Sequence, residues 1–201
     1  LAASLIKALR QHCPNIMVEG IAGPKAQAAG CHILWPMDPL SVMGIVEPLK
    51  NLPEILKLRK QIKAHFMANK PDVFIGIDAP AFNLGVEEAL HQAGIKVVHY
   101  VSPTIWAWKE KRIHKIKRSV DLMLCLLPFE PEIYHAQQVA AESVGHPFAD
   151  EIPLHSDQQL ARQQLGFDPQ DQLLAVLPGS RRSEIKHLSL HFLDAIYRCR
   201  Q

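Results

Sequence analysis

The sequence has no apolar run long enough to cross a bilayer as a helix, so it offers no candidate for a membrane-spanning segment. Its four cysteines include no Cys-x-x-Cys pair, which argues against zinc-ribbon and dithiol sites and fits a reducing compartment. A net charge of +2 creates no overall field that would attract nucleic acid. With 48% hydrophobic and 21% charged residues, the 201-residue chain has the composition of a globular protein with a substantial core.

Several familiar ligand and catalytic motifs are also missing. The sequence contains no Walker loop, no Rossmann dinucleotide fingerprint and no serine nucleophile elbow. Histidine is plentiful, at 11 residues, yet only His187 and His191 share a helix face at ligand spacing. No third ligand accompanies them, so we predict that the protein holds no metal.

The chain is organised around Pro71–Asn83. Val73–Ile77 is a short apolar run with β-branched residues, which predicts a strand buried on both faces. Asp78 follows at the strand end, where ligands bind in open parallel sheets. Asp78 could equally make only an Asx-type turn, and the stretch alone does not separate the two interpretations. Pro80 prevents a helix from starting at Ala79, so we expect Asn83 to cap the next helix.

Strands and helices alternate along most of the chain, which predicts an α/β fold with parallel strands. The weak pattern between Phe148 and Ser156 places a boundary near residue 150, between a unit at 1–150 and a second at 151–201. We expect strands at 16–22, 33–35, 71–77, 95–101, 122–127, 141–144 and 173–177. We expect helices at the opening of the chain, before Gly30, and at 84–93, 109–118, around Ile133, at 157–165 and after 184.

Leu40–Leu56 is an unusually apolar stretch bordered by basic residues. Six Lys or Arg lie between positions 50 and 70, against one acid, Glu54. An apolar face flanked by cations suits a helix lying on anionic lipid. A helix with its apolar stripe in the core is much commoner, and the pattern alone favours that interpretation.

Two further stretches indicate binding. Trp106 and Trp108 lie in one predicted loop beside a basic helix at 109–118, which slightly favours a binding role over a solvated helix face. No nucleic-acid motif accompanies them. A strand followed by Pro178-Gly179-Ser180-Arg181-Arg182 and a helix start predicts an anion site, because backbone N–H groups and guanidinium bind phosphate. The alternative is a capped helix with exposed arginines.

Taken in order, six motifs resemble the lipid-A-disaccharide synthase family over essentially all of the chain. Each is weak alone, but their order and spacing are specific. They are Gly20-Ile21-Ala22-Gly23-Pro24, Val42-Met43-Gly44-Ile45-Val46-Glu47, Gly76-Ile77-Asp78-Ala79-Pro80, Tyr100-Val101-Ser102-Pro103 with Trp106-Ala107-Trp108, Leu127-Pro128-Phe129-Glu130, and Leu177-Pro178-Gly179-Ser180-Arg181.

The resemblance implies two Rossmann-like domains of the GT-B glycosyltransferase type, with the second one truncated here. Residues 1–150 would form the acceptor and membrane-facing domain, and 151–201 the linker and start of the nucleotide-sugar domain. The implied enzyme is an inverting hexosyltransferase of Gram-negative lipid A biosynthesis. It would join UDP-2,3-diacylglucosamine to lipid X, the 2,3-diacylglucosamine 1-phosphate, giving lipid A disaccharide 1-phosphate and UDP. Its location would be cytoplasmic and peripheral on the inner membrane.

The resemblance also implies roles for single residues. Asp78 becomes the general base, which takes the proton of the attacking sugar hydroxyl. Ser180, Arg181 and Arg182 would bind the leaving diphosphate without a metal, and Asn83 would orient the acceptor. It implies no cofactor besides the UDP-sugar co-substrate, and no nucleic-acid partner. For the apolar stretch at Leu40–Leu56, the resemblance implies acyl or membrane contact instead of core packing. The residues implied are Met43, Val46, Leu49, Leu52, Ile55 and Leu56.

The sequence departs from the family's pattern at Ala81, where the family usually has a second aspartate, so no role needing paired carboxylates is carried over. The family's opening turn would precede Leu1, and most of its nucleotide domain would follow Gln201. We therefore expect the 201 residues alone to be inactive. A sugar-nucleotide epimerase and a non-catalytic lipid-surface binding module are the alternatives, and acyl-chain preference and homo-oligomerisation stay open.

Overall fold

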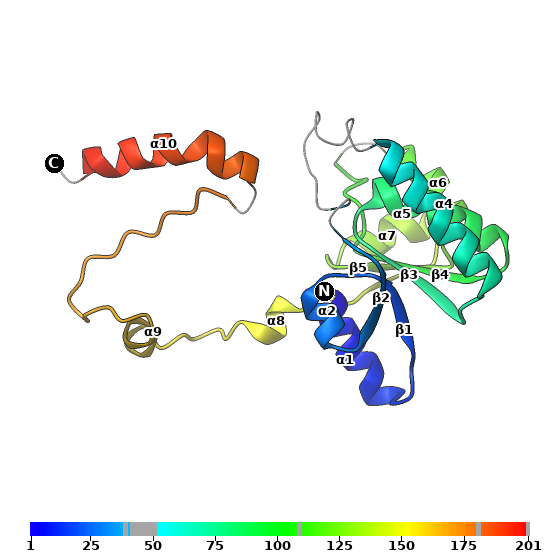
Figure 1. Cartoon of the computed structure of the whole chain (residues 1–201), viewed down its shortest axis with the longest axis horizontal. Coiled ribbons are helices and arrows are strands. Elements are labelled where there is room, and N and C mark those ends of the chain that lie inside the picture. The colour runs from blue at the N-terminus through cyan, green and yellow to red at the C-terminus, as the bar shows by residue number, and fades with distance from the viewer. Residues whose placement is uncertain (38–39, 41–51, 108–109, 180–181, 200–201) are drawn as a thin grey trace. The chain divides into compact units, whose positions relative to one another are not determined.

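The computed structural model describes residues 1–37, 40, 52–107, 110–179 and 182–199. The chain divides into two units, Leu1–Ile152 and Pro153–Gln201. The first holds every strand found in the described residues, and all of them pair in parallel (Figure 1). The predicted α/β class with parallel sheets is therefore confirmed. The functions assigned above to residues 1–150 and 151–201 stay predictions.

The first unit contains a two-stranded and a four-stranded parallel sheet. The small sheet pairs β1 (Val18–Ile21) with β2 (Cys31–Trp35), flanked by α1 (Ala2–His12) and α2 (Pro24–Ala28). The larger sheet has the strand order β3-β4-β5-β6, formed by β3 (Val73–Ile77), β4 (Lys96–Tyr100), β5 (Leu122–Cys125) and β6 (Ala141–Ser143). The first three of these strands are mostly apolar, as the sequence predicts. The predicted burial of β3 on both faces is only partly correct, because Val73 at its start is exposed.

Helix α5 (Pro80–Gln92) packs on β3 and β4 and lies between α4 (Leu52–Ala68) and α6 (Arg112–Ser119) (Figure 1). The helices bury apolar residues at helical spacing, such as Val86 and Leu90 on α5 and Ile116 on α6. The core continues to Met123 and Tyr134. The described residues of this unit also form α7 (Glu130–His135) and α8 (Phe148–Glu151).

The start of α5 corrects one prediction. The helix begins at Pro80, not after Asn83, because proline is well suited to the first helical position, where no N–H is needed. Asn83 therefore lies inside the first turn and does not cap the helix. Its side chain instead donates hydrogen bonds backward to the end of β3.

The second unit contains α9 (Gln158–Gln164), capped by Asp157, and α10 (Arg182–Cys199). The strand predicted at 173–177 is wrong, because these residues form no strand and their leucines are exposed. A short apolar run becomes a strand only where neighbouring strands satisfy its backbone groups, and the described part of this unit supplies none. No helix within the described residues is long and apolar enough to span a membrane.

Asp121, between α6 and β5, ties the sheet to α5. Its carboxylate accepts hydrogen bonds from the Val97 N–H (2.8 Å) and Lys96 Nζ (3.1 Å), and His91 Nε2 lies 3.6 Å away. Burial opposes ionisation of this carboxyl, but the two hydrogen bonds and the nearby charges outweigh it and lower the pKa of Asp121. The carboxylate thus stabilises the fold only while it is ionised.

This lowered pKa predicts an acid-sensitive contribution to stability. The contribution of Asp121 is complete above the ordinary carboxyl pKa, near 4, and is lost as the pH falls toward the lowered value. Asp121→Asn should therefore lower the free energy of unfolding at pH 7 and flatten its decline in acid. Urea unfolding at several pH values measures both quantities. An unchanged decline in the variant would contradict the prediction.

Candidate active site

Asp78 lies on a strained turn between β3 and α5. Asp78 and Ala79 both have left-handed backbone angles, with φ of 52° and 44°. Such conformations cost roughly 1–3 kcal/mol for each non-glycine residue and persist only where the surroundings hold them. The Asp78 N–H donates to the Tyr100 carbonyl (2.8 Å), and Asn83 Nδ2 donates to the Asp78 carbonyl (2.7 Å). The backbone of the turn is thus fixed on both sides of the Asp78 side chain.

The Asp78 carboxylate itself is exposed. It makes no hydrogen bond with any residue that the structure describes, and an Asx-type turn is ruled out because Pro80, two residues on, has no N–H to donate. The strained turn therefore presents an exposed carboxylate that is hydrogen-bonded to none of the described residues. Of the two interpretations of Asp78, a functional role or a simple Asx-type turn, the geometry favours the functional role.

A second strained residue follows the neighbouring strand. Val101, directly after β4, has φ of 83°, and its N–H donates to the Leu124 carbonyl (3.0 Å). For a β-branched residue this conformation is a clear outlier. Tyr100 is in register with Ile77 of β3 and Leu124 of β5, so the three strands end level with one another. Three of the four left-handed non-glycine residues in the described chain thus lie at this carboxyl edge.

The loops after β4 and β5 meet through aromatic side chains. The rings of Trp106 and Phe129 pack edge to face, with centroids 5.3 Å apart. Trp106 Nε1 donates to Glu130 Oε1 (3.4 Å), and the Leu127 N–H donates to Glu130 Oε2 (3.1 Å). Glu130 is only 2% exposed, so a buried carboxylate joins the two loops. Trp108 lies outside the described residues.

A buried hydroxyl pair lies beneath the first of these loops. Ser102 Oγ and Tyr134 Oη are 2.8 Å apart and both are buried. Burial raises the pKa of the Tyr134 phenol well above its ordinary value, although the hydrogen bond with Ser102 acts in the opposite direction. Tyr134 therefore stays neutral at physiological pH and holds the loop after β4 rather than exchanging protons.

A buried acid and histidine lie behind the turn. Glu87 of α5 and His99 of β4 are both fully buried, with Oε1 and Nδ1 2.6 Å apart. Gly76 of β3 leaves the room that this carboxylate occupies, since a methyl group there would overlap Glu87 Oε1 and come within 2.9 Å of Cδ. The close approach of α5 to β3, which sets the position of the Asp78 turn, therefore requires glycine at residue 76.

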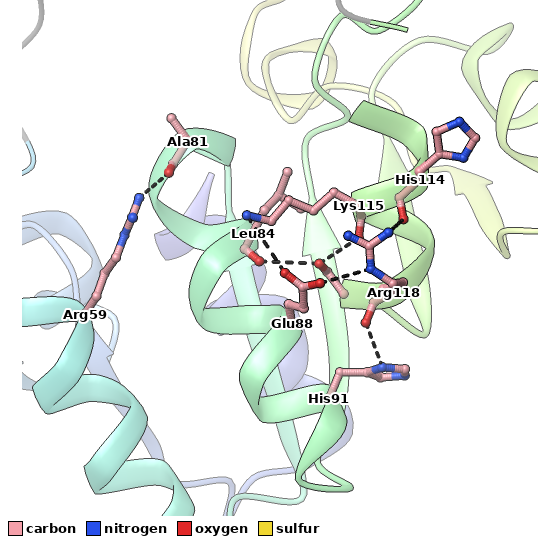
Figure 2. A network of polar contacts seen from close by, with 9 residues as sticks. Arg59, Ala81, Leu84, Glu88, His91, His114, Lys115 and Arg118 are labelled. Atoms are coloured by element: carbon pink, nitrogen blue, oxygen red, sulfur yellow. Dashed lines mark hydrogen bonds and ion pairs between the residues drawn. The ribbon is translucent and has the colours of Figure 1, made fainter. Parts of the chain in front are cut away.

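Figure 2 shows how the neighbouring helices hold α5. Arg59 of α4 donates to the Ala81 carbonyl, and its guanidinium lies 5.2 Å from the Phe82 ring centroid. Burial lowers the pKa of Arg59 from its ordinary value. On the other side, Glu88 of α5 binds Arg118 Nε (3.0 Å) and lies 4.0 Å from Lys115 Nζ. Part of the basic run on α6 thus serves to pack two helices together.

The remaining predicted site residues are only partly described. Ser180 and Arg181 lie outside the described residues, as do Met43, Val46 and Leu49. Arg182 is the first residue of α10. Leu52 and Leu56 of α4 are exposed, whereas Ile55 packs against the core with Leu58 and Ile62. No group of three His, Cys, Asp or Glu that could hold a metal occurs among the described residues.

The motifs that contain Val101 and Glu130 predict no role for either residue. No residue type marks Val101, because valine disfavours the conformation it adopts. Glu130 could have been found by the signal that identifies Asp78, an acid just after a buried strand. Its contacts to two different loops are visible only in three dimensions.

Comparison with known proteins identifies related sequences over the whole chain. The family model for lipid-A-disaccharide synthetase matches residues 1–201. A lipid-A-disaccharide synthase of Pseudoalteromonas translucida is 58% identical over 189 residues, which cover 94% of this chain and 49% of that protein. The synthase of Aeromonas hydrophila is 52% identical over 195 residues, covering 97% of this chain and 52% of its own length. The chain thus spans about half the length of the curated relatives it matches.

Proposed function

Because this chain belongs to the lipid-A-disaccharide synthetase family, we propose that the complete protein is an inverting hexosyltransferase. It would have two Rossmann-like domains in the GT-B arrangement, with this chain supplying the acceptor domain and the start of the nucleotide-sugar domain. The acceptor would be lipid X and the donor UDP-2,3-diacylglucosamine. The products would be lipid A disaccharide 1-phosphate and UDP.

The observation that carries the proposal is the exposed Asp78 carboxylate on its tethered turn. A sugar hydroxyl is a weak nucleophile at neutral pH, and a carboxylate within hydrogen-bond reach makes it reactive by taking its proton as the anomeric carbon is attacked. The backbone bonds to Tyr100 and Asn83 hold the carboxylate in place before substrate binds. Asn83 would thus act on the acceptor indirectly, by fixing the carbonyl of Asp78.

The leaving diphosphate would be bound by Ser180, Arg181 and Arg182. Guanidinium groups and the N–H groups at the start of α10 would neutralise the developing charge. The proposal therefore uses no metal and no cofactor besides the UDP-sugar. Its support is the sequence motif and the helix that begins at Arg182.

We also propose that the protein is cytoplasmic and binds peripherally to the inner membrane. Exposed Leu52 and Leu56 at the start of α4 support lipid contact by the segment that includes Met43, Val46 and Leu49. Ile55 is better explained by core packing. An exposed leucine pair followed by the cations of α4 suits the surface of an anionic bilayer.

The test is a turnover assay of the complete protein with both purified lipid substrates in mixed micelles. The expected result is disaccharide formation that requires donor and acceptor together and releases UDP in equal amount. Interconversion of the donor sugar without acceptor would instead indicate an epimerase. Lipid binding without any product would indicate a non-catalytic module. The 201-residue chain assayed alone should give no product.

A further inference from the structure

An exposed apolar patch at the carboxyl edge of the large sheet has no role in the chemistry described above. It consists of Trp106, Leu127 and Phe129, which are 44%, 41% and 46% exposed and which we call the aromatic platform. All three follow β4 or β5. Clustered apolar side chains that remain exposed at the rim of a candidate site are typical of ligand contacts.

Hydrogen bonds and ring packing hold the residues of the platform in place. Glu130 is buried and accepts one hydrogen bond from the Trp106 indole and one from the Leu127 backbone, so both loops are fixed by a single carboxylate. Burying a carboxylate is costly unless donors satisfy it, and here the donors belong to platform residues. The edge-to-face packing of Trp106 on Phe129 completes the arrangement.

The platform lies on the same edge as Asp78. Strands β3, β4 and β5 are adjacent, and their ends are level in the register. Neighbouring strands are about 4.8 Å apart, so the exits of β4 and β5 lie roughly 5 to 10 Å along the edge from the exit of β3. The loops that carry the platform therefore leave the sheet beside the Asp78 turn, and a ligand whose reacting hydroxyl meets Asp78 can extend along the edge toward them.

The chemistry of the platform favours a hydrocarbon chain. The only polar side-chain atom of the three residues is the Trp106 indole nitrogen, and its N–H is already donated to Glu130. The platform therefore has no side-chain donor left for sugar hydroxyls or for a nucleobase. Lys111, just before α6, and Arg112, its first residue, follow Trp106 closely in the sequence and suit an anionic group on the same ligand.

We propose that the aromatic platform binds an acyl chain of the acceptor glycolipid and thereby sets its chain-length preference. The inference rests on the proposed function, because it takes the acceptor to be an acylated sugar phosphate. Each buried methylene contributes about fourfold to affinity, so loss of the platform should be largest for long chains.

The test compares a long-chain and a short-chain acceptor on the complete protein. For Trp106→Ala combined with Phe129→Ala, KM for the long-chain acceptor should rise about ten- to hundredfold, with KM for the short-chain acceptor and kcat nearly unchanged. Val73→Ala is the matched control, because Val73 is also an exposed apolar residue but lies at the opposite end of β3. It should leave both KM values unchanged.

A second variant guards against misfolding of the double alanine protein. Leu127→Asp changes one exposed side chain and places a charge on the platform, which should also abolish the long-chain preference. An unchanged ratio of kcat/KM for the two acceptors in either folded variant would overturn the proposal. Weaker binding of these variants to vesicles of phosphatidylethanolamine and phosphatidylglycerol without substrate would also overturn it, because the bilayer would then be the occupant. Failure of the unaltered protein to form disaccharide would instead refute the proposed function.

Discussion

Asp78→Asn is expected to lower kcat of the complete protein by about 10²- to 10⁴-fold, with KM for the acceptor nearly unchanged. The range is the usual contribution of a positioned general base, since the amide of asparagine cannot take the hydroxyl proton. Asparagine also tolerates the left-handed backbone better than other residues with a side chain, so the turn at φ 52° should be retained. Initial-rate measurements with both lipid substrates separate kcat from KM.

The matched control for this variant is Asp72→Asn. Asp72 is likewise an exposed aspartate next to β3, but it precedes the strand and so lies at the opposite end. This change should leave the rate unaltered. A rate for Asp78→Asn within a few fold of the unaltered protein would remove Asp78 from the mechanism, and with it the main support for the reaction proposed.

Gly76→Ala is expected to lower the free energy of unfolding by about 3–5 kcal/mol, among the larger effects of single substitutions. The added methyl group would overlap Glu87 Oε1 and approach Asn83 Cβ to 3.3 Å. Relief requires moving the Glu87 carboxylate away from His99, which separates a fully buried pair, or moving α5 off the sheet. Urea unfolding followed by circular dichroism measures the loss.

Gly85→Ala provides the contrast on the same helix. Among the described residues, its added methyl group would meet the Arg59 guanidinium alone, at an ordinary contact distance of 3.8 Å. Alanine is favoured over glycine in a helix interior, so this variant should be more stable by about 0.5–1 kcal/mol. If the two variants unfolded at the same urea concentration, the explanation given for Gly76 would be wrong.

The sequence predicted the central sheet well, because its strands are encoded locally. Val73–Ile77 is a short apolar segment, and the run before Val101 carries the β-branched pair Val97 and Val98, both typical of strands in a parallel sheet. Pro80 does keep α5 from starting at Ala79, but the helix begins at Pro80 itself, so the predicted cap at Asn83 is wrong. The false strand at 173–177 shows the limit of the same local argument, since an apolar run does not specify its own hydrogen-bonding partners.

The candidate site was predictable to a smaller extent. Asp78 could be found because an acid directly follows an apolar strand. Trp106 could be found because two tryptophans share one loop beside a basic helix. The link from Trp106 through Glu130 to Leu127 joins residues on two loops, and only the parallel register of β4 and β5 brings those loops together. Nothing in the composition or spacing of the sequence predicts the strained backbone at Val101.

Helix α4 links its exposed leucines to the Asp78 turn through one side chain, Arg59. Exposed Leu52 and Leu56 lie at its start, and Arg59, about one turn further along, holds the carbonyl of Ala81 beside the Asp78 turn. A helix is stiff over this length, so a shift of the leucines also moves the guanidinium. A serine substitution at Leu52 or Leu56 could thus slow the enzyme by two separate routes, poorer anchoring and a misaligned carboxylate. Rates measured on a detergent-soluble acceptor would tell those routes apart.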